Sequence, residues 1–219
     1  MKHASKAIGH SAFTLVEMLV VLAIVGILVG LGTAAVPRIL GLGDRTDSVQ
    51  RLRGLGQAMA MYAADHGDRF PGPLWPGQVP EYDPNREGRL VQELADYLGI
   101  ERPESRMVVE SFIPRGIKRE MAGRNLAQVR VYVVRIDWEV MGVNVRPFGL
   151  LTGTRQEPES RGSLAGLDGS ANWMIAEADQ KHPNVAGAPW RGFTVREPLH
   201  DGNRAVLMLD GSVHMEPSP

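Results

Sequence analysis

Residues 12–17 read Ala12-Phe13-Thr14-Leu15-Val16-Glu17, and an uncharged apolar stretch, residues 18–36, follows at once. Glu17 therefore places a carboxylate at the entrance of a segment that carries no other charge. A charged side chain in lipid costs about 3 kcal/mol on insertion scales, so an acidic residue in this place is a candidate for function. Whether the segment enters a membrane, and what Glu17 does there, decides the architecture of the chain.

The apolar segment is long enough to span a bilayer. From Phe13 to Val36 there are 24 residues, or about 36 Å of helix at ~1.5 Å per residue. This length exceeds the ~30 Å hydrocarbon core. Lys2 and Lys6 precede the segment, and basic residues favour the cytoplasmic side. The sequence thus predicts a single pass through a membrane, with the N-terminus cytoplasmic and the bulk of the chain on the other side.

A secretory signal peptide is the main alternative for the same segment. Thr33-Ala34-Ala35 would serve as a small-residue cleavage site and release a soluble protein. Glu17 in front of the apolar run, and a run longer than secretion requires, count against this interpretation. In this alternative the chain is a periplasmic binding or enzymatic domain that uses residues 1–35 only as an anchor or a signal.

The string F-T-L-V-E over residues 13–17, followed by about twenty apolar residues, resembles the N-terminus of type IV prepilins and type II secretion pseudopilins. The resemblance implies that prepilin peptidase cuts between Ala12 and Phe13, and that Phe13 is then N-methylated. It also implies that Glu17 pairs with the N-terminus of a neighbouring subunit during assembly. The usual residue before the cut is glycine, for which Ala12 is a small substitute.

The resemblance also implies the fold class, which is α+β and pilin-like: a long N-terminal helix, with a membrane-spanning half and an amphipathic half, packed on a small antiparallel β-sheet. Pro37 predicts a kink, because proline lacks an N–H and its ring clashes with the preceding turn. Over residues 44–65 apolar side chains recur at three- or four-residue steps, which traces one face of a helix, and Gly67 predicts its end. This face comprises Val49, Leu52, Leu55, Met59, Tyr62 and His66. The predicted segments are a leader peptide (1–12), a transmembrane and assembly helix (13–37), an amphipathic stalk helix (38–66) and a periplasmic α+β domain (67–219).

Composition restricts the partners. The chain has no cysteine, so it can live in an oxidising compartment but forms no disulfide there. Removal of residues 1–12 leaves 22 basic and 25 acidic residues, a net charge of about −3. No basic stripe with interleaved aromatic residues is present, so a nucleic-acid partner is not expected. The 25 glycines and 15 prolines indicate a loop-rich, β-containing exported part.

Residue patterns predict several elements beyond the long helix. We expect a short helix over 89–98, ended by Gly99, and strands over 108–113, 129–138 and 172–178. Residues 67–88 and 152–171 are rich in glycine, proline and charge, and are expected to be irregular. The last element is a hairpin with strands over 205–209 and 212–216 around Asp210-Gly211. We expect a type I′ turn there, with positive φ at both residues.

Two C-terminal features extend the resemblance. His200, nine intervening residues and Asp210-Gly211 resemble the H-x9-DG signature of prepilin-like proteins, and residues 61–71 resemble the end of a pseudopilin stalk helix. We interpret His200, Asp210 and Gly211 as structural, with His200 holding the adjoining strand in place. No catalytic residue is predicted, since no nucleophile elbow, phosphate loop or dinucleotide fingerprint is present.

A cation site in the C-terminal region is the sharper alternative. Major pseudopilins resemble one another in holding calcium in a C-terminal loop, and calcium takes oxygen ligands. The oxygens would come from Asp168, Asp179, Asp201 and Asp210, whose spacing matches no known calcium loop. His182, His200 and His214 lack the spacing of a zinc ligand pair. We therefore expect no metal and no cofactor.

These observations predict a structural, non-enzymatic subunit of a type II secretion pseudopilus or a type IV pilus-like filament. Its partners would be prepilin peptidase, other pilin or pseudopilin subunits that join through their helices, and the inner membrane. After assembly the subunit would lie in a filament or at the cell surface.

Overall fold

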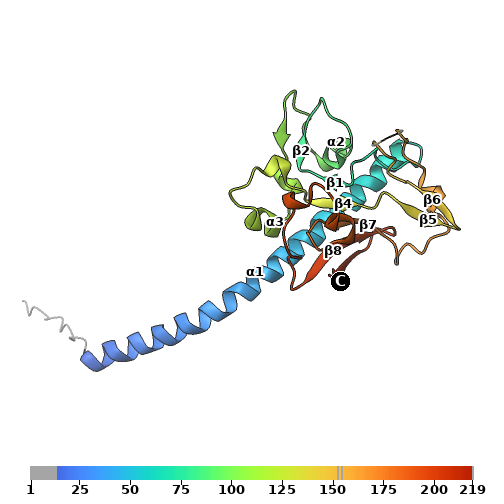
Figure 1. Ribbon diagram of the computed structural model, residues 1–219. Coiled ribbons are helices and arrows are strands. Elements are labelled where there is room, and N and C mark those ends of the chain that lie inside the picture. Colours follow the sequence, from blue (N-terminus) through green and yellow to red (C-terminus); the bar gives the residue numbers. More distant parts are fainter. Residues whose placement is uncertain (1–13, 152, 154, 219) are drawn as a thin grey trace, which may run out of the picture. The chain divides into compact units, whose positions relative to one another are not determined.

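The computed structural model describes residues 14–151, 153 and 155–218, with the backbone alone over 31–40. The expected leader and the cleavage junction between Ala12 and Phe13 lie outside the described residues. The chain divides into two compact units, Met1–Leu42 and Gly43–Pro219. Helix α1 (Leu15–Asp65) contributes residues to both units (Figure 1).

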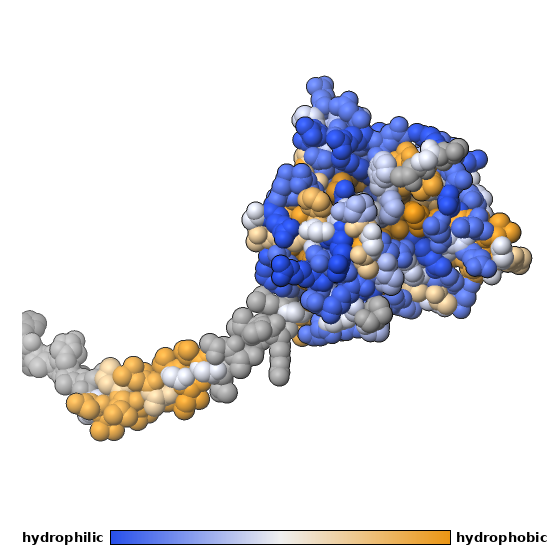
Figure 2. Space-filling view, viewed as in Figure 1, coloured by the Kyte–Doolittle hydropathy of each residue, from blue (hydrophilic) through white to orange (hydrophobic). Residues whose placement is uncertain are grey.

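The first part of α1 is apolar on every side. Within residues 15–29 the large apolar side chains are exposed, from 47% for Val21 to 82% for Leu15. Figure 2 shows them as a hydrophobic sleeve on this part of the helix. The helix assignment continues through Pro37, and the expected kink there stays a prediction. Among the residues that the structure describes, no helix combines the length and apolar content required to cross a membrane.

The second part of α1 is amphipathic, as the sequence predicts. Leu52, Leu55 and Met59 are buried, and Tyr62 is half-buried. The expected face is wrong at its last member, because α1 ends at Asp65 and His66 lies exposed beyond it. The end itself agrees with the prediction, since Gly67 has φ 64°.

A five-stranded antiparallel sheet forms the centre of the second unit. Its spatial order is β1 (Gly77–Gln78), β4 (Tyr132–Val134), β7 (Trp173–Glu177), β8 (Asn203–Met208) and β9 (Val213–Pro217). Two smaller antiparallel pairs are β2 (Glu81–Tyr82) with β3 (Met107–Val108), and β5 (Trp138–Val140) with β6 (Val143–Val145). The fold is therefore α+β, with an N-terminal helix packed on a small antiparallel sheet.

Alternation along the strands gives the sheet two buried faces. Ile175 and Leu207 belong to the same core cluster as Leu52 and Leu55 of α1. The helix approaches closely because Gly56 lacks a side chain, and a Cβ there would stand 3.1 Å from Cδ1 of Leu207. The opposite face carries a smaller cluster, which comprises Val133, Ala176, Ala178, Val185, Val206 and Met208.

Short helices occupy the connections between strands. The α-helices are α2 (Leu90–Glu93), α3 (Arg115–Glu120) and α4 (Pro183–Ala186). The 3₁₀ helices are η1 (Asp96–Leu98), η2 (Glu110–Phe112), η3 (Leu126–Gln128), η4 (Arg161–Leu164) and η5 (Arg191–Phe193). The expected helix over 89–98 is thus split into α2 and η1, with Gly99 at φ 64° as its predicted end.

Three expectations for strands need correction. Residues 108–113 begin in β3 but turn into η2, which buries the consecutive Phe112 and Ile113, whereas a strand would send them to opposite faces. Residues 129–138 form β4 and then β5, with a break where the indole N–H of Trp138 donates to the Arg135 carbonyl at 2.8 Å. Residues 67–88 are not wholly irregular, because they supply β1 and β2.

The predicted C-terminal hairpin is confirmed in β8 and β9, but the type I′ turn is wrong. Gly211 has φ 84°, while Asp210 is not among the residues with positive φ. The Gly211 N–H donates to the Met208 carbonyl at 3.0 Å, and the Met208 N–H donates to the Ser212 carbonyl at 2.8 Å. The loop is therefore longer than two residues, and the left-handed position falls after the turn.

Candidate functional site

The described start of α1 is a capping box built from Thr14 and Glu17. The backbone N–H and the hydroxyl of Thr14 each donate to Oε2 of Glu17 at 2.8 Å. In return, the Glu17 N–H donates to the Thr14 hydroxyl at 3.2 Å. A helix leaves its first N–H groups without partners, and this reciprocal arrangement satisfies two of them. Within this chain, the Glu17 carboxylate thus stabilises the start of the helix.

The helix behind Glu17 offers no charge to it. Over residues 14–30, Glu17 is the only charged side chain. Gly26 and Gly30, four residues apart, each have open space where a Cβ would stand. Small residues at this spacing let two helices approach closely. The surface can therefore take a second apolar helix, and an ionic partner for Glu17 would have to come from outside residues 14–30.

His200, from the C-terminal motif, lies against Glu177 in the second unit. Nε2 of His200 is 3.0 Å from Oε2 of Glu177, and both side chains are almost fully buried. The same oxygen accepts the Ala205 N–H at 3.0 Å, so Glu177 ties His200 to the first residues of β8.

A buried ion pair lies beside this contact. Nε of Arg204 donates to Oδ2 of Asp179 at 2.7 Å, and its Nη2 donates to Oδ1 at 3.2 Å. The exposed fraction of the side chain is 4% for Arg204 and 2% for Asp179. A bidentate geometry of this kind compensates two charges that would each be costly to bury alone. The pair joins the segment after β7 to β8.

His182 is a third buried polar group in this region. Its Nδ1 accepts the Asn184 N–H at 3.1 Å and so caps the short helix α4. Burial, assisted by the positive charge of Arg204 and opposed by Asp179, lowers the pKa of His182 to about 4. The ring is therefore neutral at neutral pH, as its role as a hydrogen-bond acceptor requires.

The structure separates the members of the C-terminal motif. His200 precedes β8, whereas Asp210 and Gly211 follow it, so strand β8 lies between them. Oδ1 of Asp210 accepts the N–H and hydroxyl of Ser212 at 2.9 and 2.6 Å, which closes the hairpin loop. The two ends of the motif therefore do not form one joint site.

The four aspartates predicted as alternative calcium ligands do not meet in one site. Asp179 is held by Arg204, and Asp201 lies in the turn before β8 at φ 53°. Asp168 lies near Asp210, but its Oδ1 accepts bonds from Ser170 in a loop of its own. No group of three metal-ligating acidic or histidine side chains occurs within the described part of the chain.

The sequence-based predictions missed the residues that contact Glu17 at the start of α1 and those that form the buried polar contacts of the second unit. Thr14 has a readable signal, because Ser or Thr three residues before Glu, ahead of an apolar run, is the pattern of a capping box. Glu177 and Arg204 have none: they lie 23 and 25 residues from their partners along the chain. Only the pairing of β7 with β8 brings them together.

Comparison with protein families identifies the N-terminus. Residues 9–33 match the family described as prokaryotic N-terminal methylation motif. No curated protein and no solved structure matches the chain. The chain thus carries a prepilin-type cleavage and methylation motif of the pilin-like kind, and the match includes Glu17 and most of the apolar segment.

Proposed function

We propose that this chain is a structural subunit of a pilus-like filament, of the type II secretion pseudopilus or type IV pilus kind. The observation that carries the proposal is the methylation motif over residues 9–33, with Glu17 as the only charged side chain over residues 14–30, in the exposed apolar part of α1. Prepilin peptidase would cut between Ala12 and Phe13, and Phe13 would receive the methyl group. The inner membrane would hold the subunit until it assembles.

The exposed surface of α1 supports this role physically. A helix that is apolar all round is stable only when something covers it, either lipid or other helices. No described part of the chain covers residues 15–29, as their exposed side chains show. Identical helices could replace lipid around this segment at little cost, and Gly26 and Gly30 would permit close contact.

Glu17 would have two successive roles in this proposal. In the single chain it caps the helix through Thr14. In the filament its negative charge would attract the ammonium group of a neighbouring Phe13, an interaction that low dielectric surroundings strengthen. A carboxylate can accept from both partners at once, so pairing need not disrupt the cap.

Mass spectrometry of the N-terminal peptide tests the processing step. We expect a membrane-bound product that begins with N-methylated Phe13 when the chain is coexpressed with a prepilin peptidase. The unprocessed chain should remain when the peptidase is omitted. A terminus at Val36, with soluble protein outside the membrane, would instead support the alternative of a secreted binding or enzymatic domain.

A set of three variants separates the charge of Glu17 from its capping bonds. Glu17→Gln keeps an acceptor for Thr14 but removes the charge. Thr14→Ala removes both bonds of the Thr14 hydroxyl but keeps the charge and the bond from the backbone N–H of residue 14. Glu17→Ala removes the charge and both bonds to the carboxylate, and keeps only the bond from its own N–H to the Thr14 hydroxyl. We expect filament incorporation to fall strongly, at least tenfold, in both Glu17 variants and only slightly in Thr14→Ala. If Glu17→Gln assembles normally, the ionic role is wrong.

A further inference from the structure

A pocket of about 580 Å³ opens in the second unit between β1 and the loop before α2. This volume lies within the range of small-molecule sites. Gln78 holds the two walls together, because its buried side chain donates to the Gly88 carbonyl at 3.2 Å and also accepts the Leu90 N–H. The backbone N–H of Trp75 also donates to the Gly88 carbonyl, at 3.0 Å. The pocket is therefore preformed.

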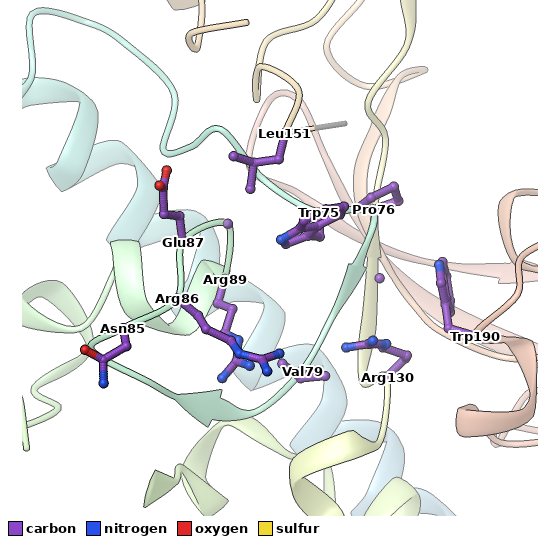
Figure 3. A pocket seen from close by; sticks show the side chains of 12 residues that line it. Trp75, Pro76, Val79, Asn85, Arg86, Glu87, Arg89, Arg130, Leu151 and Trp190 are labelled. Atoms are coloured by element: carbon purple, nitrogen blue, oxygen red, sulfur yellow. The ribbon is translucent and has the colours of Figure 1, made fainter. Parts of the chain in front are cut away.

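Two tryptophans bound the pocket, and each covers a glycine. A Cβ on Gly77 would stand 2.9 Å from the ring of Trp190, and a Cβ on Gly88 would stand 2.5 Å from the ring of Trp75. Glycine at these positions lets the indoles lie close to the backbone. Trp75 nevertheless remains 43% exposed, so part of its ring is open to a ligand. Figure 3 shows both rings beside the cavity.

Arginines form the polar side of the same pocket. Arg86, Arg89 and Arg130 line it, and all three also line an adjoining pocket of about 350 Å³ together with Arg106. Figure 3 shows the side chain of Arg130 directed toward those of Arg86 and Arg89. Such a cluster of guanidinium groups is suited to a carboxylate or a phosphate.

The nearby acids neutralise only part of this cluster. Glu81 pairs with Arg89 at 2.6 Å, Asp83 with Arg86 at 3.6 Å, and Glu87 with Arg155. Within the described residues, no ion pair includes Arg106 or Arg130. Two positive charges around the joined pockets thus lack a counter-charge.

Arg130 is the most unusual member. Its Nε is shielded from solvent and has no hydrogen-bond partner among the described residues. Burial and the neighbouring charge of Arg89 both lower the pKa of the Arg130 guanidinium. A shielded donor without an acceptor costs free energy, and the uncompensated guanidinium that carries it would be stabilised by a negative charge in the pocket.

We propose that these joined pockets bind a ring-bearing oxyanion, whose carboxylate or phosphate pairs with Arg130 and whose ring stacks on the open part of Trp75. Arg106 adds long-range attraction at the exposed end of the adjoining pocket. The site lies within the second unit alone, and its binding does not depend on whether the chain assembles into filaments.

Titration calorimetry of the full chain in neutral detergent tests the proposal. The probes are trigalacturonate, which presents carboxylates on sugar rings, and AMP, which presents a phosphate on a nucleoside. Their matched neutral controls are methyl-esterified trigalacturonate and adenosine. We expect saturable, salt-sensitive binding of one charged probe at submillimolar concentration, at least tenfold tighter than its neutral control. The ratio of the two affinities shows whether the pocket prefers a carboxylate or a phosphate.

Variants assign the binding to this pocket. Arg130→Gln should weaken binding at least tenfold while leaving the melting temperature unchanged or higher, because it removes an uncompensated cation. Arg53→Gln, an exposed arginine of α1 outside both pockets, is the matched control and should bind normally. Arg106→Gln, which loses no ion pair, should weaken binding about threefold and serves if Arg130→Gln does not fold. No saturable binding of either charged probe, or equal binding by the pocket variants and Arg53→Gln, would overturn the proposal.

Discussion

Within residues 15–29 of α1, twelve large apolar side chains are exposed, whereas Leu52, Leu55 and Met59 of the same helix are buried. Both stretches are helical, so secondary structure does not explain the difference. The second stretch has a polar side and an apolar side, and the apolar side is covered by the sheet. The first has no polar side. A helix of that kind needs a cover, and the described residues of its unit do not supply one.

The two parts of α1 stabilise different states, the folded single chain in one case and an association in the other. In the second unit, burial of side chains between α1 and the sheet stabilises the fold of one chain. In the first, the same residue types are available for association with lipid or with other copies. Substitutions in the two parts should therefore change different measurements, the free energy of unfolding in one and association in the other.

A matched pair of leucines gives the largest expected contrast. Leu52 is fully buried, and Leu22 is 69% exposed. Leu52→Ala should lower the free energy of unfolding by about 3 kcal/mol, since it removes buried methyl groups and leaves a cavity. Leu22→Ala should change it by less than about 0.5 kcal/mol. Urea unfolding of the full chain in detergent, followed by tryptophan fluorescence, measures both values, and equal losses would contradict the comparison.

Local patterns predicted those parts of the fold that local interactions determine. The spacing of Leu52, Leu55 and Met59 indicated the buried face, and Asp210-Gly211 between β-rich runs indicated the hairpin. β1 escaped prediction because Gly77 and Gln78 stand among prolines and have no strand pattern. These residues form a strand only because they pair with Val133 and Tyr132 of β4, which lie more than fifty positions away in the sequence.

The candidate sites show the same difference between local and long-range interactions. The motif around Glu17 is contiguous, so sequence alone located it, and the Thr14 cap was also readable there. Arg130 was visible only as a charge within a β-rich run. The pocket that it lines is formed by residues in and after β1, in the loop before α2 and in the region of Trp190. Tertiary packing creates such a site, and residue spacing carries no signal for it.

The free energy of unfolding of the second unit should depend on pH through His182. The pKa of His182 is about 4 in the fold against an ordinary value of 6.5. Between these values the unfolded chain binds the proton and the folded chain does not, so stability should fall as pH drops from 6.5 toward 4. The loss should reach about 3 kcal/mol, and it should level off below the folded pKa.

A variant isolates this effect from other titrating groups. His182→Asn cannot titrate but can still cap α4, because asparagine is a favoured N-cap residue. Its stability should decline less than that of the wild type between pH 6.5 and 4.5. His214→Asn alters an exposed histidine on β9 and should keep the wild-type decline. Parallel curves for wild type and His182→Asn would contradict the prediction.

The smallest expected effect contrasts two glycines. Gly211 has φ 84° in the hairpin loop, with open space around it, so only its backbone conformation restricts substitution. Gly211→Val should therefore lower the free energy of unfolding by about 1–2 kcal/mol. Gly26 is helical and also has open space, and valine is slightly better than glycine in a helix. Gly26→Val should thus leave unfolding unchanged while weakening association between helices.

Thermal unfolding with calcium or with a chelator completes this test at the hairpin. If Asp210 and Gly211 serve only to close the loop, the melting temperatures of the wild type and of Gly211→Val should not respond to calcium. Asp210→Ala should then lose only the bonds from Ser212, about 1 kcal/mol, with or without the ion. A melting temperature that rises with calcium in the wild type but not in Asp210→Ala would instead assign a cation to the loop, because a ligand that binds only the folded state stabilises it.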